Sequence, residues 1–99
     1  MGTGEENQGF HFINAFPNPF RDKLTLRISS TKDQKVSAYI YDMNGIAIKK
    51  YDNKTLTVGV NELYWDGRND NGAFVNPGMY FVRVITNSKV DNLTIIKMQ

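Results

Sequence analysis

The sequence predicts an all-β protein, an antiparallel β-sandwich of about seven strands. Short segments alternate apolar and polar residues with a period of two, and clusters of Gly, Pro, Asn and Asp separate them at short intervals. No stretch combines the length, the caps and the 3.6-residue period of a helix. At 99 residues the chain has the size of one domain with one core. We expect residues 14–99 to form it, and residues 1–13 to be a linker or an artificial start, with residues that could begin a first strand.

The first segments after that start are extended. His11 alternates with Phe10 and Phe12 as in a strand, so we interpret this single histidine as structural. The stretch "FPNPFRDK", residues 16–23, contains Pro17 and Pro19, which lack backbone donors and push their neighbours toward extended geometry. It is therefore predicted to lie at an edge and not to pair in the middle of a sheet.

A strand pair follows. "KLTLRIS" and "KVSAYIYDM" each alternate, and their predicted inward residues are Leu24, Leu26 and Ile28 in the first and Val36, Ala38 and Ile40 in the second. The Asn-Gly pair of "DMNG" tolerates positive φ and is a strong hairpin signal. "IAIKKY" is the predicted return strand, with Ile46 and Ile48 facing inward.

The second half is predicted to hold three more strands. One runs from Val60 to Trp65, one covers "MYFVRVIT" with Tyr80, Val82 and Val84 on one face, and the last lies in "SKVDNLTIIKMQ". Between the first two, the loop of residues 66–78 is rich in turn formers, and its "NPG" is the signature of a type II turn. We expect Trp65 to close one end of the core, with its indole N–H donating to a backbone carbonyl.

Composition excludes several functions. The chain has no cysteine, so a disulfide, a thiolate nucleophile and a Cys-based zinc site are ruled out, and one histidine cannot build a multi-His metal site. A net charge of +2, spread along the chain, argues against nucleic acid or an anionic membrane as the main partner. No segment approaches the roughly 18 apolar residues of a membrane span. The first nine residues lack the apolar stretch of a signal peptide.

The polar loop of residues 66–78 is one candidate for a functional site. Asp66, Asn69 and Asp70 offer oxygen ligands suited to Ca²⁺, but the register of an EF-hand loop is missing. Catalysis by Asp66 and Asp70 would need a cleft and separated pKa values, which the sequence does not indicate. The need for turn-forming side chains explains these residues more simply. We therefore expect that the domain binds no cofactor and is not an enzyme.

A second candidate is a surface stripe. Tyr39, Tyr41, Phe81 and Arg83 have the strand parity opposite to the predicted core. If their strands are neighbours, they form an aromatic and cationic stripe that could stack on sugar rings or bind a partner domain. Cross-strand pairing that stabilises the sheet is the simpler interpretation.

The motifs "PNPF", "YDMNG", "WDGRNDNGAFVNPGMYFVRV" and "LTIIKMQ" together carry a resemblance over residues 15–99. The chain resembles the C-terminal sorting domain (type A) of cargo proteins of the type IX secretion system of Bacteroidetes. Its middle and end are also similar to the immunoglobulin-like domain of flagellar hook-capping proteins. "PNPF" and the closing strand favour the sorting domain.

The resemblance implies an immunoglobulin-like sandwich that follows a larger cargo domain, is exported through the periplasm, and ends secreted or on the cell surface. Its partners would be the outer-membrane secretion machinery and its sortase-like peptidase. It places the sorting signal at Gly78, Tyr80, Leu93, Ile95, Ile96, Lys97 and Met98. The alternatives are a carbohydrate- or protein-binding accessory module, to which the stripe would belong, and a hook-capping-type structural domain.

Overall fold

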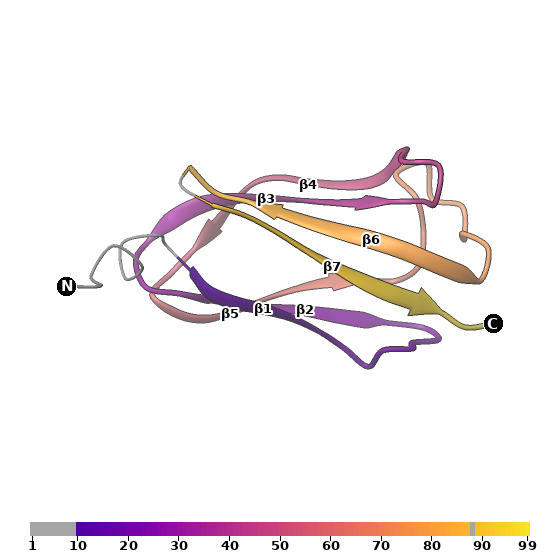
Figure 1. Cartoon of the computed structure of the whole chain (residues 1–99), viewed down its shortest axis with the longest axis horizontal. Coiled ribbons are helices and arrows are strands. Elements are labelled where there is room, and N and C mark those ends of the chain that lie inside the picture. The colour runs from indigo at the N-terminus through magenta and orange to yellow at the C-terminus, as the bar shows by residue number, and fades with distance from the viewer. Residues whose placement is uncertain (1–9, 88) are drawn as a thin grey trace.

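The computed structural model describes residues 10–87 and 89–99, and in this part seven strands form two antiparallel sheets packed face to face (Figure 1). The strands are β1 (Phe10–Phe16), β2 (Leu24–Ser30), β3 (Gln34–Tyr41), β4 (Ala47–Leu56), β5 (Gly59–Trp65), β6 (Gly78–Ile85) and β7 (Val90–Lys97). The predicted all-β antiparallel sandwich is confirmed.

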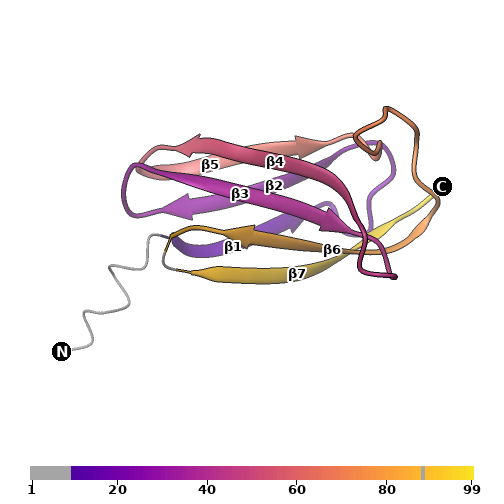
Figure 2. The ribbon, with the colours of Figure 1, turned by 90° about the horizontal axis from the view of Figure 1, so that it is seen from above.

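The strand order is β1-β2-β5 in one sheet and β4-β3-β6-β7 in the other. Seen from above, the two layers overlie each other along the long axis of a body of 46 × 22 × 22 Å (Figure 2). β7 runs antiparallel beside β6. The end of β7 therefore lies at the end of the sandwich where β6 begins. This order places β3 beside β6, which the sequence alone could not establish.

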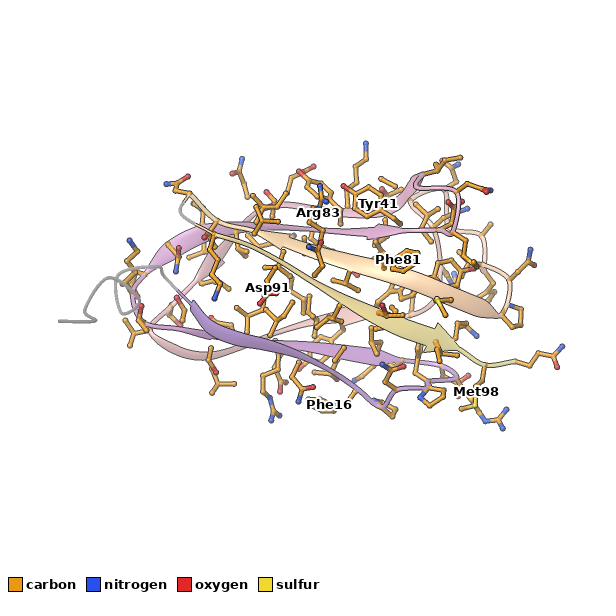
Figure 3. All side chains as sticks on the ribbon, in the orientation of Figure 1. Phe16, Tyr41, Phe81, Arg83, Asp91 and Met98 are labelled. Atoms are coloured by element: carbon orange, nitrogen blue, oxygen red, sulfur yellow. The ribbon has the colours of Figure 1, made fainter. Side chains whose placement is uncertain are left out.

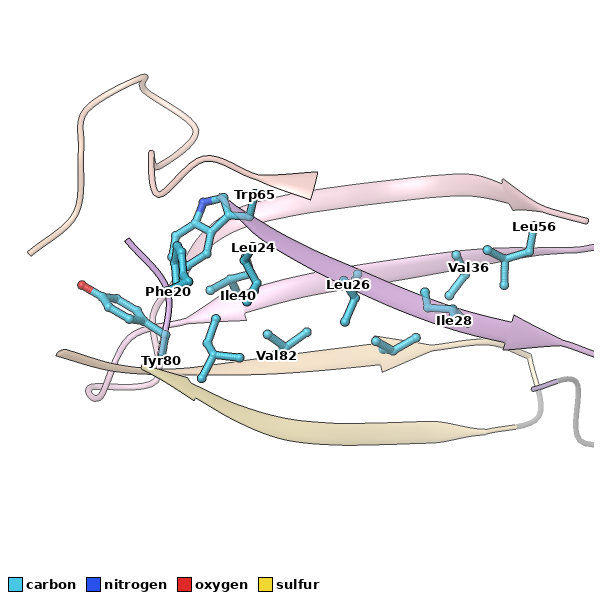
Figure 4. Close-up of a cluster of buried hydrophobic side chains, with 13 residues drawn as sticks. Phe20, Leu24, Leu26, Ile28, Val36, Ile40, Leu56, Trp65, Tyr80 and Val82 are labelled. Atoms are coloured by element: carbon cyan, nitrogen blue, oxygen red, sulfur yellow. The ribbon is translucent and has the colours of Figure 1, made fainter. Parts of the chain in front are cut away.

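The core lies between the sheets because each strand turns every second side chain inward. The inward residues predicted for the strands at 24–28, 36–40 and 80–84 are all buried, and Leu56 and Ile95 join them (Figure 4). Each buried aliphatic side chain contributes roughly 1.5–3 kcal/mol relative to exposure.

Aromatic side chains close one end of this core. Trp65 is 2% exposed, and its ring packs 5.3 Å from that of Phe20 and 5.7 Å from that of Tyr80, centroid to centroid (Figure 4). The indole Nε1–H donates to the carbonyl of Arg68 at 2.8 Å. The predicted role of Trp65 and its predicted backbone partner are therefore confirmed.

Two turns have the same hydrogen-bond geometry. In residues 42–46, the carbonyl of Asp42 accepts from the amide of Gly45, and its carboxylate accepts from the amides of Asn44 and Ile46. In residues 69–73, Asn69 makes the corresponding bonds to the next residues. The fourth residue of each turn is a glycine with positive φ, +81° for Gly45 and +86° for Gly72. The polar loop residues are thus turn formers, as predicted.

The prediction that Ile46 faces inward is wrong, because this side chain is 60% exposed. Only Gly45 of the Asn-Gly pair has positive φ, and the pairing of β3 with β4 shifts between Ile40 and Tyr41. Ile48, the extra residue of this bulge, packs against the core, whereas Ile46 lies in the turn before β4 begins at Ala47. A second shift accompanies Asn53, whose φ is +51°. Such bulges protect an edge strand from pairing with another chain.

The loop before β6 also differs from its prediction. Gly78 has a φ of +148°, far from the +80° or so that a type II turn requires. Instead, the hydroxyl of Tyr80 donates to the carbonyl of Asn76 at 2.5 Å. A tyrosine near the start of this strand that bonds to the backbone just upstream is the tyrosine corner of immunoglobulin-like sandwiches.

Candidate functional site

The segment around "PNPF" and the last strand form one structural unit. The side-chain amide of Asn18 accepts from the amide of Ile96 at 2.9 Å and donates to the carbonyl of Thr94 at 3.0 Å. This amide group therefore occupies the place that a neighbouring strand's peptide would take along β7. We call residues 18–20 the clasp.

Phe20 continues the pairing through its backbone. Its amide donates to the carbonyl of Ile96 at 2.9 Å, and its carbonyl accepts from the amide of Met98 at 2.7 Å. The ring of Phe20 is fully buried, so the core anchors the clasp. Next to it, Arg21 donates to the carbonyl of Gln99 at 2.7 Å. The predicted edge position of the Pro-containing segment agrees with this arrangement, in which Phe20 bridges to Lys97 at the outer edge of the sheet.

The residues of the implied sorting signal lie on the neighbouring strands β6 and β7, except Met98, which directly follows β7. Gly78 lies opposite Lys97, and Tyr80 lies opposite Ile95. Tyr80 and Ile95 are buried. The tyrosine corner gives Tyr80, and the Gly78 turn that precedes it, a structural role. Burial raises the pKa of Tyr80 above its ordinary value. These side chains shape the strand and present little surface to a partner.

The other four residues of that set are more accessible. Ile96 is 41% exposed, while Leu93, Lys97 and Met98 are half-buried. The Nζ of Lys97 donates to the carbonyl of Met98 at 2.6 Å and lies 5.7 Å from the ring centre of Phe20. Lys97 thus belongs to the clasp region as well as to the strand.

The structure brings the residues of the predicted stripe side by side, because β3 and β6 are neighbours. Tyr39 lies opposite Arg83, and Tyr41 lies opposite Phe81, on the face of the sheet away from the core. Figure 3 shows Tyr41, Phe81 and Arg83 near one another over β3 and β6. The rings of Tyr39 and Tyr41 are 6.4 Å apart, and the Arg83 guanidinium is 5.9 Å from the ring centre of Tyr41. The Tyr39 hydroxyl donates to Asp52 at 2.9 Å, and this bond raises the pKa of Tyr39.

A shallow, open hollow of about 410 Å³ lies on this face. Its lining is Tyr41, Gly45, Phe81, Arg83 and Asn92. Gly45 and Asn92 were absent from the predicted stripe, as were the exposed neighbours Met79 and Ile96. Once the neighbours of β6 are known, strand parity places Asn92, Met79 and Ile96 on the same outer face. Gly45 lies in a turn, so parity does not identify it.

Asp66, Asn69 and Asp70, the alternative calcium ligands, all contact other groups of the protein. The carboxylate of Asp66 accepts from the amide of Arg68, the amide oxygen of Asn69 accepts from two backbone amides, and Asp70 lies 3.5 Å from the Nζ of Lys49. Among the side chains of residues 13–87 and 89–99, no three His, Cys, Asp or Glu gather into a group that could hold a metal. His11 and the stretch "GEENQG" lie outside the residues whose side chains are described.

The strand order, the tyrosine corner and the single core define an immunoglobulin-like β-sandwich domain. The family model of the FlgD Ig-like domain matches residues 20–89, and the chain belongs to this family.

Solved structures agree with this assignment. Latent dimeric PorU from Porphyromonas gingivalis superposes with a TM-score of 0.74 at 26% identity, over 87% of this chain and 9% of PorU. PorZ from the same organism, described as an essential surface component of the type IX secretion system, has a TM-score of 0.67 at 24% identity, over 99% of this chain and 12% of PorZ. FlgD from P. aeruginosa has a TM-score of 0.56 at 19% identity, over 76% of this chain and 60% of FlgD.

The chain therefore corresponds to a small part of PorU and PorZ, 9% and 12% of their lengths. No curated protein matches it in sequence. In the described part of the chain, no helix is long and apolar enough to cross a membrane.

Proposed function

We propose that this chain is a non-catalytic sorting and anchoring domain, which directs a cargo domain joined before it through the type IX secretion system. The observation that carries the proposal is the clasp, since Asn18 and Phe20 hold the end of β7 and the residue after it, Met98. The "PNPF" and "LTIIKMQ" motifs, 76 to 78 positions apart, thus form one unit at one end of the sandwich.

The comparisons support the same proposal. The chain has the fold of a domain of PorZ, a surface component of that system, and is 26% identical to a part of PorU from the same organism. By this proposal the domain works at the cell surface or after secretion, its partners are the outer-membrane machinery and its peptidase, and it needs no cofactor.

The test is a fluorescent reporter that carries a signal peptide before it and residues 14–99 after it. It is expressed in a bacterium with a working type IX system and in the same strain without one. Surface delivery only in the working strain is the expected result. Periplasmic retention in both strains would contradict the proposal. A deletion of residues 93–99 is a poor control because it removes Ile95, which is fully buried.

Membership of the FlgD Ig-like family favours a second candidate, a structural domain of a flagellar hook cap. Complementation of a strain that lacks its hook-capping protein distinguishes the two. Restored motility with a chimera that carries this domain would favour the flagellar function. A binding module is the third candidate, favoured by the aromatic face.

A further inference from the structure

The two outer faces of the sandwich differ in whether their charged side chains have partners of opposite charge. On the three-stranded sheet, Arg27 pairs with Glu62 at 2.8 Å, and Tyr64 donates to the same carboxylate group at 2.8 Å. Lys23 lies 4.5 Å from the ring centre of Tyr64. The charged groups of that face therefore satisfy one another, as is usual for a solvated surface.

The four-stranded sheet instead exposes apolar side chains that adjoin one another. Met79 lies opposite Ile96, and Phe81 lies opposite Tyr41. Met79, Phe81 and Ile96 are 40%, 37% and 41% exposed. We call the set Tyr41, Met79, Phe81, Arg83 and Ile96 the β6 face. Contiguous apolar surface rimmed by polar groups is typical of a protein interaction site.

The charge on this face is not balanced within the described chain. Arg83 donates from Nε to Asn92 Oδ1 at 3.2 Å and forms no ion pair with any described residue. Asp52, on β4 two strands away from Arg83, already accepts from Tyr39. A guanidinium among aromatic rings binds a carboxylate well, since its paired donors match the two carboxylate oxygens.

We propose that the β6 face is the surface through which a protein of the export machinery docks, by an apolar patch that carries a carboxylate opposite Arg83. This inference rests on the proposed sorting function and names the surface that would be read. All of the face except Tyr41 lies on β6 and β7, the strands that also carry Gly78, Tyr80 and Ile95, and the buried side chains of Tyr80 and Ile95 support these strands from the core. Its hollow is open and mostly apolar, whereas small-ligand sites are enclosed and bury most of their ligand.

The first experiment replaces the apolar contacts with residues that suit strands. A triple variant, Met79→Thr, Phe81→Thr and Ile96→Thr, is tested in the reporter assay, after its melting temperature shows that it folds. The matched control is Val60→Thr with Tyr64→Thr on the other sheet, where the side chains are 64% and 52% exposed. We expect surface delivery to fall at least tenfold in the triple variant and to stay within twofold in the control.

The second experiment changes one charge and leaves the packing intact. Arg83→Glu is expected to lower surface delivery at least tenfold, and Arg83→Lys to retain part of it. Lys32→Glu, an exposed position in the turn between β2 and β3, makes the same change in net charge and should have no effect.

The outcomes separate the two proposals. Failure of the unmodified reporter in the working strain would overturn both. Normal delivery of the unmodified reporter, the triple variant and Arg83→Glu alike would overturn the docking surface and leave the sorting function standing. If the unmodified domain binds a bacterial glycan on an array, and the same variants abolish that binding along with delivery, the occupant is a saccharide and the protein-docking proposal is wrong.

Discussion

Replacing Asn18 with alanine should loosen the last strand without unfolding the core. The change removes the bonds to Ile96 and Thr94, at 2.9 and 3.0 Å. Each such bond contributes roughly 0.5–1.5 kcal/mol, and water replaces part of it because Asn18 is exposed, so we expect a loss of about 1 kcal/mol in the free energy of unfolding. For a domain of this size that corresponds to a melting temperature lower by about 4–8 °C.

Amide hydrogen exchange by NMR locates the effect. The amide of Ile96 should lose at least tenfold of its protection in Asn18→Ala, while amides in the centre of β6 keep theirs. Asn18→Asp is the matched control, because its carboxylate still accepts from Ile96 but cannot donate to Thr94. An Asn18→Ala variant with unchanged stability and unchanged exchange at Ile96 would refute the strand-like role of this side chain.

Three further predictions concern groups outside the clasp. The pKa of Glu62 is lowered first by its bond to Arg27, so its carboxylate stabilises the fold above its ordinary pKa of 4.5, and this is lost as the pH falls through the lowered value. In Arg27→Ala, an NMR titration should find that pKa raised; an unchanged value would contradict the assignment. Trp65→Phe leaves the Arg68 carbonyl without its donor and should cost about 1–3 kcal/mol in denaturant unfolding. An unaltered midpoint would show that this bond is dispensable. Gly67→Ala should cost more than Gly45→Ala, because both have positive φ but only at Gly67 would a Cβ meet Lys97, at 2.9 Å. Equal costs would mean that Lys97 moves aside freely.

Much of the fold could be predicted from sequence because its core strands follow a simple rule. Where a strand faces the core on one side and water on the other, as β2 and β6 do, alternation identifies the strand and its buried face. The edge strand β4 was predicted too short and partly with the wrong face. Its residues 50–55 are mostly polar, and its two bulges break the alternation that the prediction depends on.

The candidate surfaces required information that no local pattern contains. The pairing of Tyr41 with Phe81 depends on the strand order, which is set by packing over the whole domain. The role of Asn18 was equally hidden, because a side chain that imitates a strand's peptide leaves no periodic signal. The tyrosine corner gives the tyrosine of the Gly78-x-Tyr80 motif a structural role in addition to the one that the resemblance implies.

The clasp also sets the order in which the domain can be completed during protein synthesis. Asn18 is made early, but its partners at Thr94 and Ile96 leave the ribosome 76 to 78 residues later. Until then Phe20 lacks the strand beside it, and the end of the core near Trp65 stays open. During synthesis the domain therefore cannot complete its fold until β7 has emerged from the ribosome. Translation of an mRNA truncated before β7 gives a product with exposed aromatic side chains. Quality-control proteases can distinguish this product from a domain that contains β7.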